Sequence, residues 1–134
     1  MPHVSKIKLN NKNQEALIKN LEVILTKINK SDDMEYFLTS LLTTTEKLML
    51  AKRIAIVILL KEGVSESNIS NALHVTRVTV SRMQYFFESR GQGYEIAIKI
   101  LEKEKLTKEF RKVLLVLVKY SARAAGGYVK PTIV

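Results

Sequence analysis

Hydrophobic residues recur at spacings of three and four along almost the whole chain, and no alternating pattern extends beyond a few residues. A period near 3.6 is that of one face of an α-helix, whereas a strand repeats every two residues. The pattern predicts helices over about residues 13–29, 31–42, 43–62, 65–73, 76–90, 94–105 and 107–125. We therefore expect an all-α fold, formed as a single helical domain over residues 1–134.

Small polar residues and glycines mark the ends of these helices. Thr43 and Glu46 have the spacing of a capping box, in which each side chain binds the backbone amide of the other residue. Gly63 stands where a glycine commonly ends a helix, and "RGQG" is expected to end the helix before it. Hydroxyl or carboxylate side chains are placed to cap four other helices, namely Ser31 or Asp32, Ser65, Thr76 and Thr107.

The helix over residues 43–62 is apolar on more than one face. Its apolar positions include Leu48, Ala51, Ile54, Ala55, Ile58 and Leu59. A helix with this pattern must be covered on several sides. We expect it to be a central core helix or the seam between two subunits.

The two helices over residues 65–90 have the pattern of a helix-turn-helix unit, in which two short helices cross steeply around a turn of three or four residues. Apolar residues occupy the five positions where the pair must cover a core, namely Ile69, Leu73, Val75, Val80 and Met83. Ser70 is small where the second helix passes close. The turn normally contains glycine in a left-handed conformation, but His74 stands there, and histidine is among the residues enriched at positive φ.

The outward face of the second helix favours a DNA-binding role. It carries Arg77, Val78, Thr79, Ser81, Arg82 and Tyr85, with Thr76 as the cap, and no acidic residue precedes Glu88. Hydroxyl and guanidinium groups bind both base edges and phosphates, and such helices present their N-terminal residues to the major groove. We expect Thr76, Arg77, Val78 and Thr79 to contact bases. Phosphate or secondary contacts are expected from Ser67, Ser70, Ser81 and Arg82.

The charge of the chain supports a polyanionic partner. The formal net charge is +9, and the excess lies at the two ends: residues 1–30 contribute +4 and residues 91–134 contribute +5. Neutralising phosphates with basic side chains releases counterions, which favours binding to nucleic acid. A lysine-rich surface that only keeps the protein in solution has the same composition.

The segment "FLTSLLTTTEKLMLAKRIAIVILLKEGVSESNISNALHVTRVTVSRM", residues 37–83, resembles the Trp repressor family. It shares the skeleton "LLT…E…R…I…LL…G…S…I…L…V…TVSR" with uninterrupted spacing, and the similarity extends over about residues 13–105. The resemblance implies a six-helix subunit, here with an extra C-terminal helix, and an intertwined dimer from which the helix-turn-helix units project.

The same resemblance raises the question of a small ligand. In tryptophan-responsive members two arginines sandwich the indole ring, and Arg53 and Arg82 occupy the matching places, with Thr43 at another pocket position. Those members continue with a small Gly-Ser-Asn-Ser run that leaves room for tryptophan. This chain has "MQYF" there, so we expect the pocket to be filled and neither tryptophan nor another small corepressor to be required.

Other kinds of chemistry find little support in the sequence. The chain has no cysteine and only two histidines, His3 and His74, whose spacing does not suit a metal site. No nucleophile motif or phosphate-binding loop is present, so we expect no enzymatic activity. No apolar run approaches the ~18 residues of a membrane span, and the N-terminus lacks the apolar core of a signal peptide. These patterns favour a cytoplasmic protein.

We therefore expect a dimeric, sequence-specific regulator of transcription that binds double-stranded DNA, with a repressor-like role. Two alternatives stay open. One is a DNA-binding accessory protein in replication or transposition, where similar helix-turn-helix units occur. The other is a helical protein–protein adaptor whose positive charge is incidental.

Overall fold

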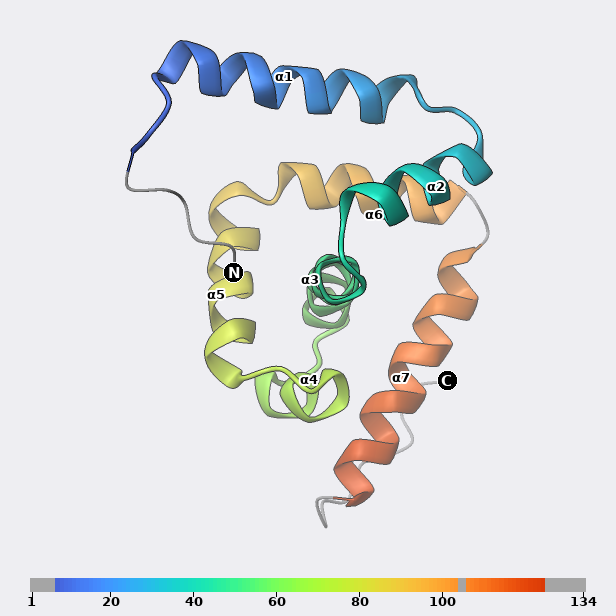
Figure 1. Cartoon of the computed structure of the whole chain (residues 1–134). Helices are drawn as coiled ribbons and strands as arrows, with labels where there is room; N and C mark the ends of the chain where they lie inside the picture. The colour runs from blue at the N-terminus through green and yellow to red at the C-terminus, as the bar shows by residue number, and fades with distance from the viewer. Residues whose placement is uncertain (1–6, 104–105, 125–134) are drawn as a thin grey trace. The chain divides into compact units, whose positions relative to one another are not determined.

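A computed structural model describes residues 7–103 and 106–124 of the chain. Within these ranges it contains seven α-helices and no β-strand (Figure 1). The helices are α1 (Asn11–Lys27), α2 (Ser31–Leu41), α3 (Thr44–Lys61), α4 (Glu66–Leu73), α5 (Arg77–Arg90), α6 (Gln92–Lys103) and α7 (Leu106–Ala124). The all-α prediction is confirmed, and the extra C-terminal helix is present. Residue 125, where we expected that helix to end, lies outside the described residues.

The chain divides into two compact units, over residues 1–47 and 48–134. The helix α3 begins in the first unit and continues through the second. The expectation of a single domain stays a prediction.

The first unit contains α1, α2 and the start of α3. The Asn10 side chain caps α1 by accepting a hydrogen bond from the Asn13 amide at 2.8 Å, so this helix begins earlier than predicted. The predicted cap of α2 by Ser31 or Asp32 is wrong. Both residues lie within its first turn, where the carboxylate of Asp32 suits the positive helix end, and Lys30 precedes it without a side-chain cap. Neither α1 nor α2 buries a residue.

The start of α3 is the capping box that the sequence predicts. The Thr43 amide donates to Glu46 Oε1 at 3.0 Å, and the Glu46 amide donates to Thr43 Oγ1 at 3.1 Å. The amide and the hydroxyl of Thr43 lower the pKa of Glu46 from its ordinary value of 4.5. At the other end, Gly63 adopts φ +81° and the Val64 amide returns to the Leu59 carbonyl at 3.0 Å, which closes the helix.

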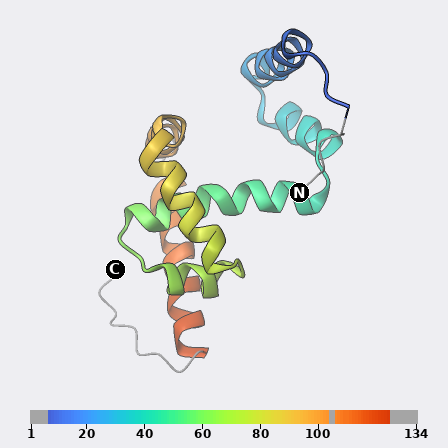
Figure 2. The ribbon, with the colours of Figure 1, turned by 90° about the vertical axis from the view of Figure 1, so that its left-hand side faces the viewer.

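The core of the second unit lies around the C-terminal half of α3. Figure 1 looks along this helix, with α4, α5, α6 and α7 around it, and Figure 2 shows the same helices from the side. Five consecutive residues of α3 are buried, namely Ala55, Ile56, Val57, Ile58 and Leu59. Burial of every face over this stretch confirms that α3 is a central helix.

The remaining helices follow α5 after tight breaks. A Cβ at Gly91 would lie 2.2 Å from the Phe87 carbonyl oxygen, so only glycine allows the chain to leave α5 there. The next helix, α6, begins at Gln92, two residues before the predicted start, and includes Gly93. The last helix, α7, begins at Leu106, so the predicted cap Thr107 lies inside it. Leu114 and Val118 of α7 join the core.

Candidate nucleic-acid interface

The helix-turn-helix unit is formed by α4, α5 and the three residues between them. Ser65 caps α4 by accepting from the Asn68 amide at 3.3 Å. Helix α4 ends at Leu73, and His74 follows in the left-handed conformation at φ 53° and ψ 51°. Both the cap and the left-handed histidine agree with the sequence-based prediction.

Ser70 holds the turn closed. Its carbonyl oxygen accepts a hydrogen bond from the Val75 amide at 3.2 Å, and its hydroxyl donates to the Val75 carbonyl at 2.5 Å. A larger side chain at this place would separate α4 from the turn. The sequence indicated only that the residue must be small, and the hydroxyl's role as an internal donor appears only in the structure.

The apolar positions predicted for this unit are those that face the core. Ile69 and Val80 are fully buried, and Leu73 and Met83 are buried almost completely. Val75 is partly buried against them. The two helices are therefore packed against each other through five side chains, which gives α5 a defined orientation on α4.

The first turn of α5 is capped and exposed. Thr76 accepts a hydrogen bond from the Thr79 amide at 3.1 Å, and the hydroxyls of these two threonines lie 2.8 Å apart. Arg77 is exposed, and Val78 exposes 66% of its surface although it is apolar. This turn contains no acidic residue, so the positive helix end, the arginine and the hydroxyls form one surface suited to an anion.

The other predicted DNA-binding residues lie on the same unit. Ser67 is exposed in the first turn of α4, and Ser81 and Arg82 are exposed on α5. Ser70 is only half-buried, but its hydroxyl is already bonded to Val75. The structure thus places seven of the eight predicted residues at the surface and uses the eighth within the turn.

The C-terminal half of α5 is built from aromatic contacts. The Arg90 guanidinium lies 4.3 Å from the centre of the Phe86 ring, and the Tyr85 and Phe86 rings lie 5.9 Å apart. Met83 is part of the core, whereas Tyr85 exposes 65% of its surface. Of the "MQYF" side chains expected to fill a ligand pocket, Met83 is buried and Tyr85 faces solvent.

The three residues predicted for a ligand site, Thr43, Arg53 and Arg82, differ in their exposure and in their contacts. Thr43 belongs to the first unit and forms the capping box. Arg53 is half-buried on α3 and makes interactions of its own, while Arg82 is exposed on α5. The apolar hollow of the second unit is lined by other residues: Ala51, Ile54, Ala97, Ile100, Leu101, Glu109, Phe110 and Val113.

Comparison with protein families decides the identity of this fold. A family model described as Trp repressor protein matches residues 14–105, which is more than half of the chain. The chain belongs to the Trp repressor protein family. The resemblance seen in the sequence is confirmed. Neither the comparison with curated proteins nor that with solved structures gives a match.

The Trp repressor protein family is one of non-enzymatic, helix-turn-helix DNA-binding regulators, and the unit formed by α4 and α5 lies inside the matched range. The match ends at residue 105, before α7 begins. Among the residues that the structure describes, no helix is long and apolar enough to cross a membrane. In the same part of the chain, no three His, Asp or Glu side chains are grouped as a metal site requires.

Proposed function

We propose that this protein is a sequence-specific transcriptional repressor that binds double-stranded DNA as a dimer and does not depend on tryptophan. The observation that carries this proposal is the exposed, acid-free first turn of α5, fixed on α4 by five packed side chains. Helix-turn-helix proteins place this turn in the major groove.

The side chains of this turn suit base edges. Arg77 has the donor pair that binds the O6 and N7 acceptors of guanine, and Val78 offers an apolar surface to a thymine methyl group. The exposure of Val78 to solvent is unfavourable for a free protein, and contact with a thymine methyl would remove it from water. Thr76 and Thr79 bind bases or the adjoining phosphate, and Ser67, Ser81 and Arg82 bind the backbone on either side.

The proposed dimer rests on exposed apolar surface. Large apolar side chains are exposed on α1 and α3, namely Leu17, Ile18, Leu21, Val23, Ile24, Leu25, Leu48, Met49, Leu50 and Ile54. Exposed apolar surface commonly marks a protein–protein interface. A second copy of the chain would cover these side chains, and the absence of any buried residue in α1 and α2 of the single subunit supports such a partner.

Independence from tryptophan rests on the residues after Arg82. A buried Met83 and the aromatic pair Tyr85 and Phe86 replace the small residues that leave room for the amino acid in tryptophan-responsive members. We therefore propose that no corepressor is needed, and that Arg53 and Arg82 are not used for ligand binding.

The proposal is tested by titrating a random-sequence duplex with the protein over a series of salt concentrations. Phosphate contacts release counterions, so the affinity is expected to fall steeply as salt increases, by about 10³-fold or more between 50 and 200 mM for six or more contacts. Absent binding, or binding that does not change with salt, would contradict a DNA-binding role and favour a protein–protein adaptor.

A further inference from the structure

The last helix, α7, lies outside the family match and packs on the helix-turn-helix unit. The match ends at residue 105, and α7 begins at Leu106. Backbone packing between the described helices is densest where α7 meets α4. Figure 1 shows α5 on one side of α4 and α7 on the other. The first helix of the DNA-binding unit is therefore held from two sides.

Buried side chains join α7 to the same core as the helix-turn-helix unit. Leu114 and Val118 lie one turn apart on α7 and expose 3% and 1% of their surfaces. They belong to one cluster with Ile69 and Leu73 of α4. Because interiors are closely packed, a movement of α4 relative to α7 would open space around these four side chains.

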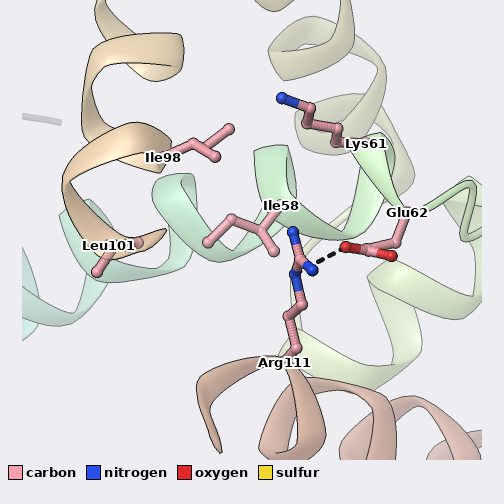
Figure 3. A pocket seen from close by; sticks show the side chains of 6 residues that line it. All are labelled: Ile58, Lys61, Glu62, Ile98, Leu101 and Arg111. Atoms are coloured by element: carbon pink, nitrogen blue, oxygen red, sulfur yellow. Dashed lines mark ion pairs between the residues drawn. The ribbon is translucent and has the colours of Figure 1, made fainter. Parts of the chain in front are cut away.

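An arginine of α7 also reaches Glu62, the first residue of the turn that leads from α3 to α4. Arg111 Nε lies 2.8 Å from Glu62 Oε1 (Figure 3). Its Nη2 lies 3.9 Å from Glu102 Oε1. Among the described residues no acceptor meets the buried Nε–H in hydrogen-bond geometry, so the contact with Glu62 is an ion pair. Lys61 Nζ donates a hydrogen bond to Glu95 Oε2 of α6 at 3.1 Å, and the two charges also form an ion pair.

These contacts lie at the short turn that connects α3 to α4. Between α3 and α4 the chain has only Glu62, Gly63, Val64 and Ser65, and Gly63 is in a conformation that favours glycine. A short glycine turn limits the distance between two helices but not their angle. The Arg111–Glu62 ion pair is partly exposed, so its contribution to the free energy of unfolding is small. We expect its main effect to be on the orientation of the turn that follows α3.

We propose that α7 is a brace that fixes the angle of the helix-turn-helix unit on α3, with Leu114, Val118 and Arg111 as positioning residues. This rests on the proposed DNA-binding function. In a dimer, the angle of each unit sets the separation of the two recognition helices. The brace therefore restricts the protein to one spacing between the two half-sites of its operator, without help from a bound small molecule.

The test compares duplexes that carry two selected half-sites at the preferred spacing and at one base pair more or fewer. The wild-type protein is expected to prefer one spacing by about tenfold or more. In Leu114→Ala and in Arg111→Gln that ratio is expected to fall towards one, with unchanged affinity for a single half-site. Val116→Ala and Lys112→Gln make matched changes at exposed positions of α7 and are expected to keep the wild-type ratio.

The spacing ratio separates positioning from simple loss of stability. A variant that is partly unfolded loses affinity for every duplex in the same proportion, so its ratio does not change. If Leu114→Ala fails to fold, Arg111→Gln decides, because it removes only two partly exposed ion pairs. A wild-type ratio in Arg111→Gln overturns the brace. If the wild-type protein binds none of the duplexes, the proposed DNA-binding function itself fails.

Discussion

At the start of α5, Thr76 and Thr79 are joined by a capping hydrogen bond, and Arg77 and Val78 between them are exposed to solvent. The Thr76 hydroxyl accepts from the Thr79 amide at 3.1 Å, which satisfies one of the amides left open at a helix start. Arg77 and Val78 then remain exposed, with no acidic neighbour in that turn. Replacing Arg77 should therefore change a contact with DNA without changing the stability of the helix.

Replacing Arg77 tests that contact. Arg77→Ala is expected to weaken binding to the preferred site by about 1–3 kcal/mol and to relax the preference at one base position, since a bidentate pair with guanine is lost. The measurement is an affinity titration on that site and on single-base variants. Arg90→Ala removes the same charge from the opposite end of α5 and is expected to keep the base preference. An Arg77→Ala protein with wild-type affinity would rule out this role.

Glu46 gives a prediction about pH. Hydrogen bonds from the Thr43 amide and hydroxyl hold the pKa of Glu46 below its ordinary value of 4.5. A carboxylate whose pKa is lowered on folding stabilises the fold above its unfolded pKa, and this contribution is lost as the pH falls through the folded value. The start of α3 is therefore expected to fray as the pH falls below about 4.5.

An NMR titration of the Glu46 carboxyl group measures this directly. We expect a midpoint below 4.5 in the wild-type protein and a shift part of the way back in Thr43→Ala, which keeps the amide and loses the hydroxyl. Thr45→Ala changes a neighbouring exposed threonine outside the box and serves as the control. An unshifted wild-type midpoint would mean that the box does not form in solution.

At the scale of the helices, the sequence predicted each element and several of its ends. Thr43, Ser65 and Thr76 cap the helices that follow them, because each stands immediately before an apolar periodic segment. The predicted starts were wrong at α1, α2, α6 and α7. Helix α6 begins two residues earlier than predicted, and Thr107 lies inside α7. Asn10 provides an earlier cap than the apolar pattern indicates, and Lys30 stands where a capping side chain was expected.

The turn between α4 and α5 allows a test of backbone strain. His74 is the only non-glycine residue with positive φ in the described part of the chain. A left-handed conformation costs a residue with a Cβ roughly 1–2 kcal/mol, so His74→Gly is expected to stabilise the protein by up to about 1 kcal/mol after the entropy of glycine is included. Thermal or urea unfolding measures the change.

Asn71→Gly, within α4 and exposed, is the matched control for that substitution. Glycine lowers the stability of a helix interior, so this variant is expected to be less stable than the wild-type protein. If His74→Gly were destabilised as much as Asn71→Gly, the left-handed turn would not be the conformation in solution.

At the scale of the whole molecule, sequence-based reasoning misses the contacts between distant segments. The periodicity of α7 shows an apolar face, but not that Leu114 and Val118 join the same buried cluster as Ile69 of α4. The sequence shows that the Ser70 side chain is small, whereas its hydrogen bond to the Val75 carbonyl depends on the path of the turn. Such contacts depend on the arrangement of the helices, which local propensity does not determine.

The apolar hollow between α3, α6 and α7 gives a test of the dimer. The subunit has a mass of 15.3 kDa, and sedimentation is expected to show twice this value. Ile54 lines the hollow, belongs to the apolar surface proposed to meet the second copy and exposes 38% of its surface, so Ile54→Glu is expected to give folded monomers. Gln92→Glu adds the same charge at an exposed position of α6 outside that surface and is expected to remain a dimer. A monomeric wild-type protein would contradict the proposed assembly.

The central claim is tested most directly by selecting bound duplexes from a random DNA pool, with and without tryptophan. The account predicts one enriched pseudo-palindrome, the same in both selections. Its half-sites should lie about one helical turn apart, a spacing of ~34–36 Å taken from dimeric helix-turn-helix proteins that include Trp repressor itself. Enrichment of no sequence, or enrichment only when tryptophan is present, would contradict the account.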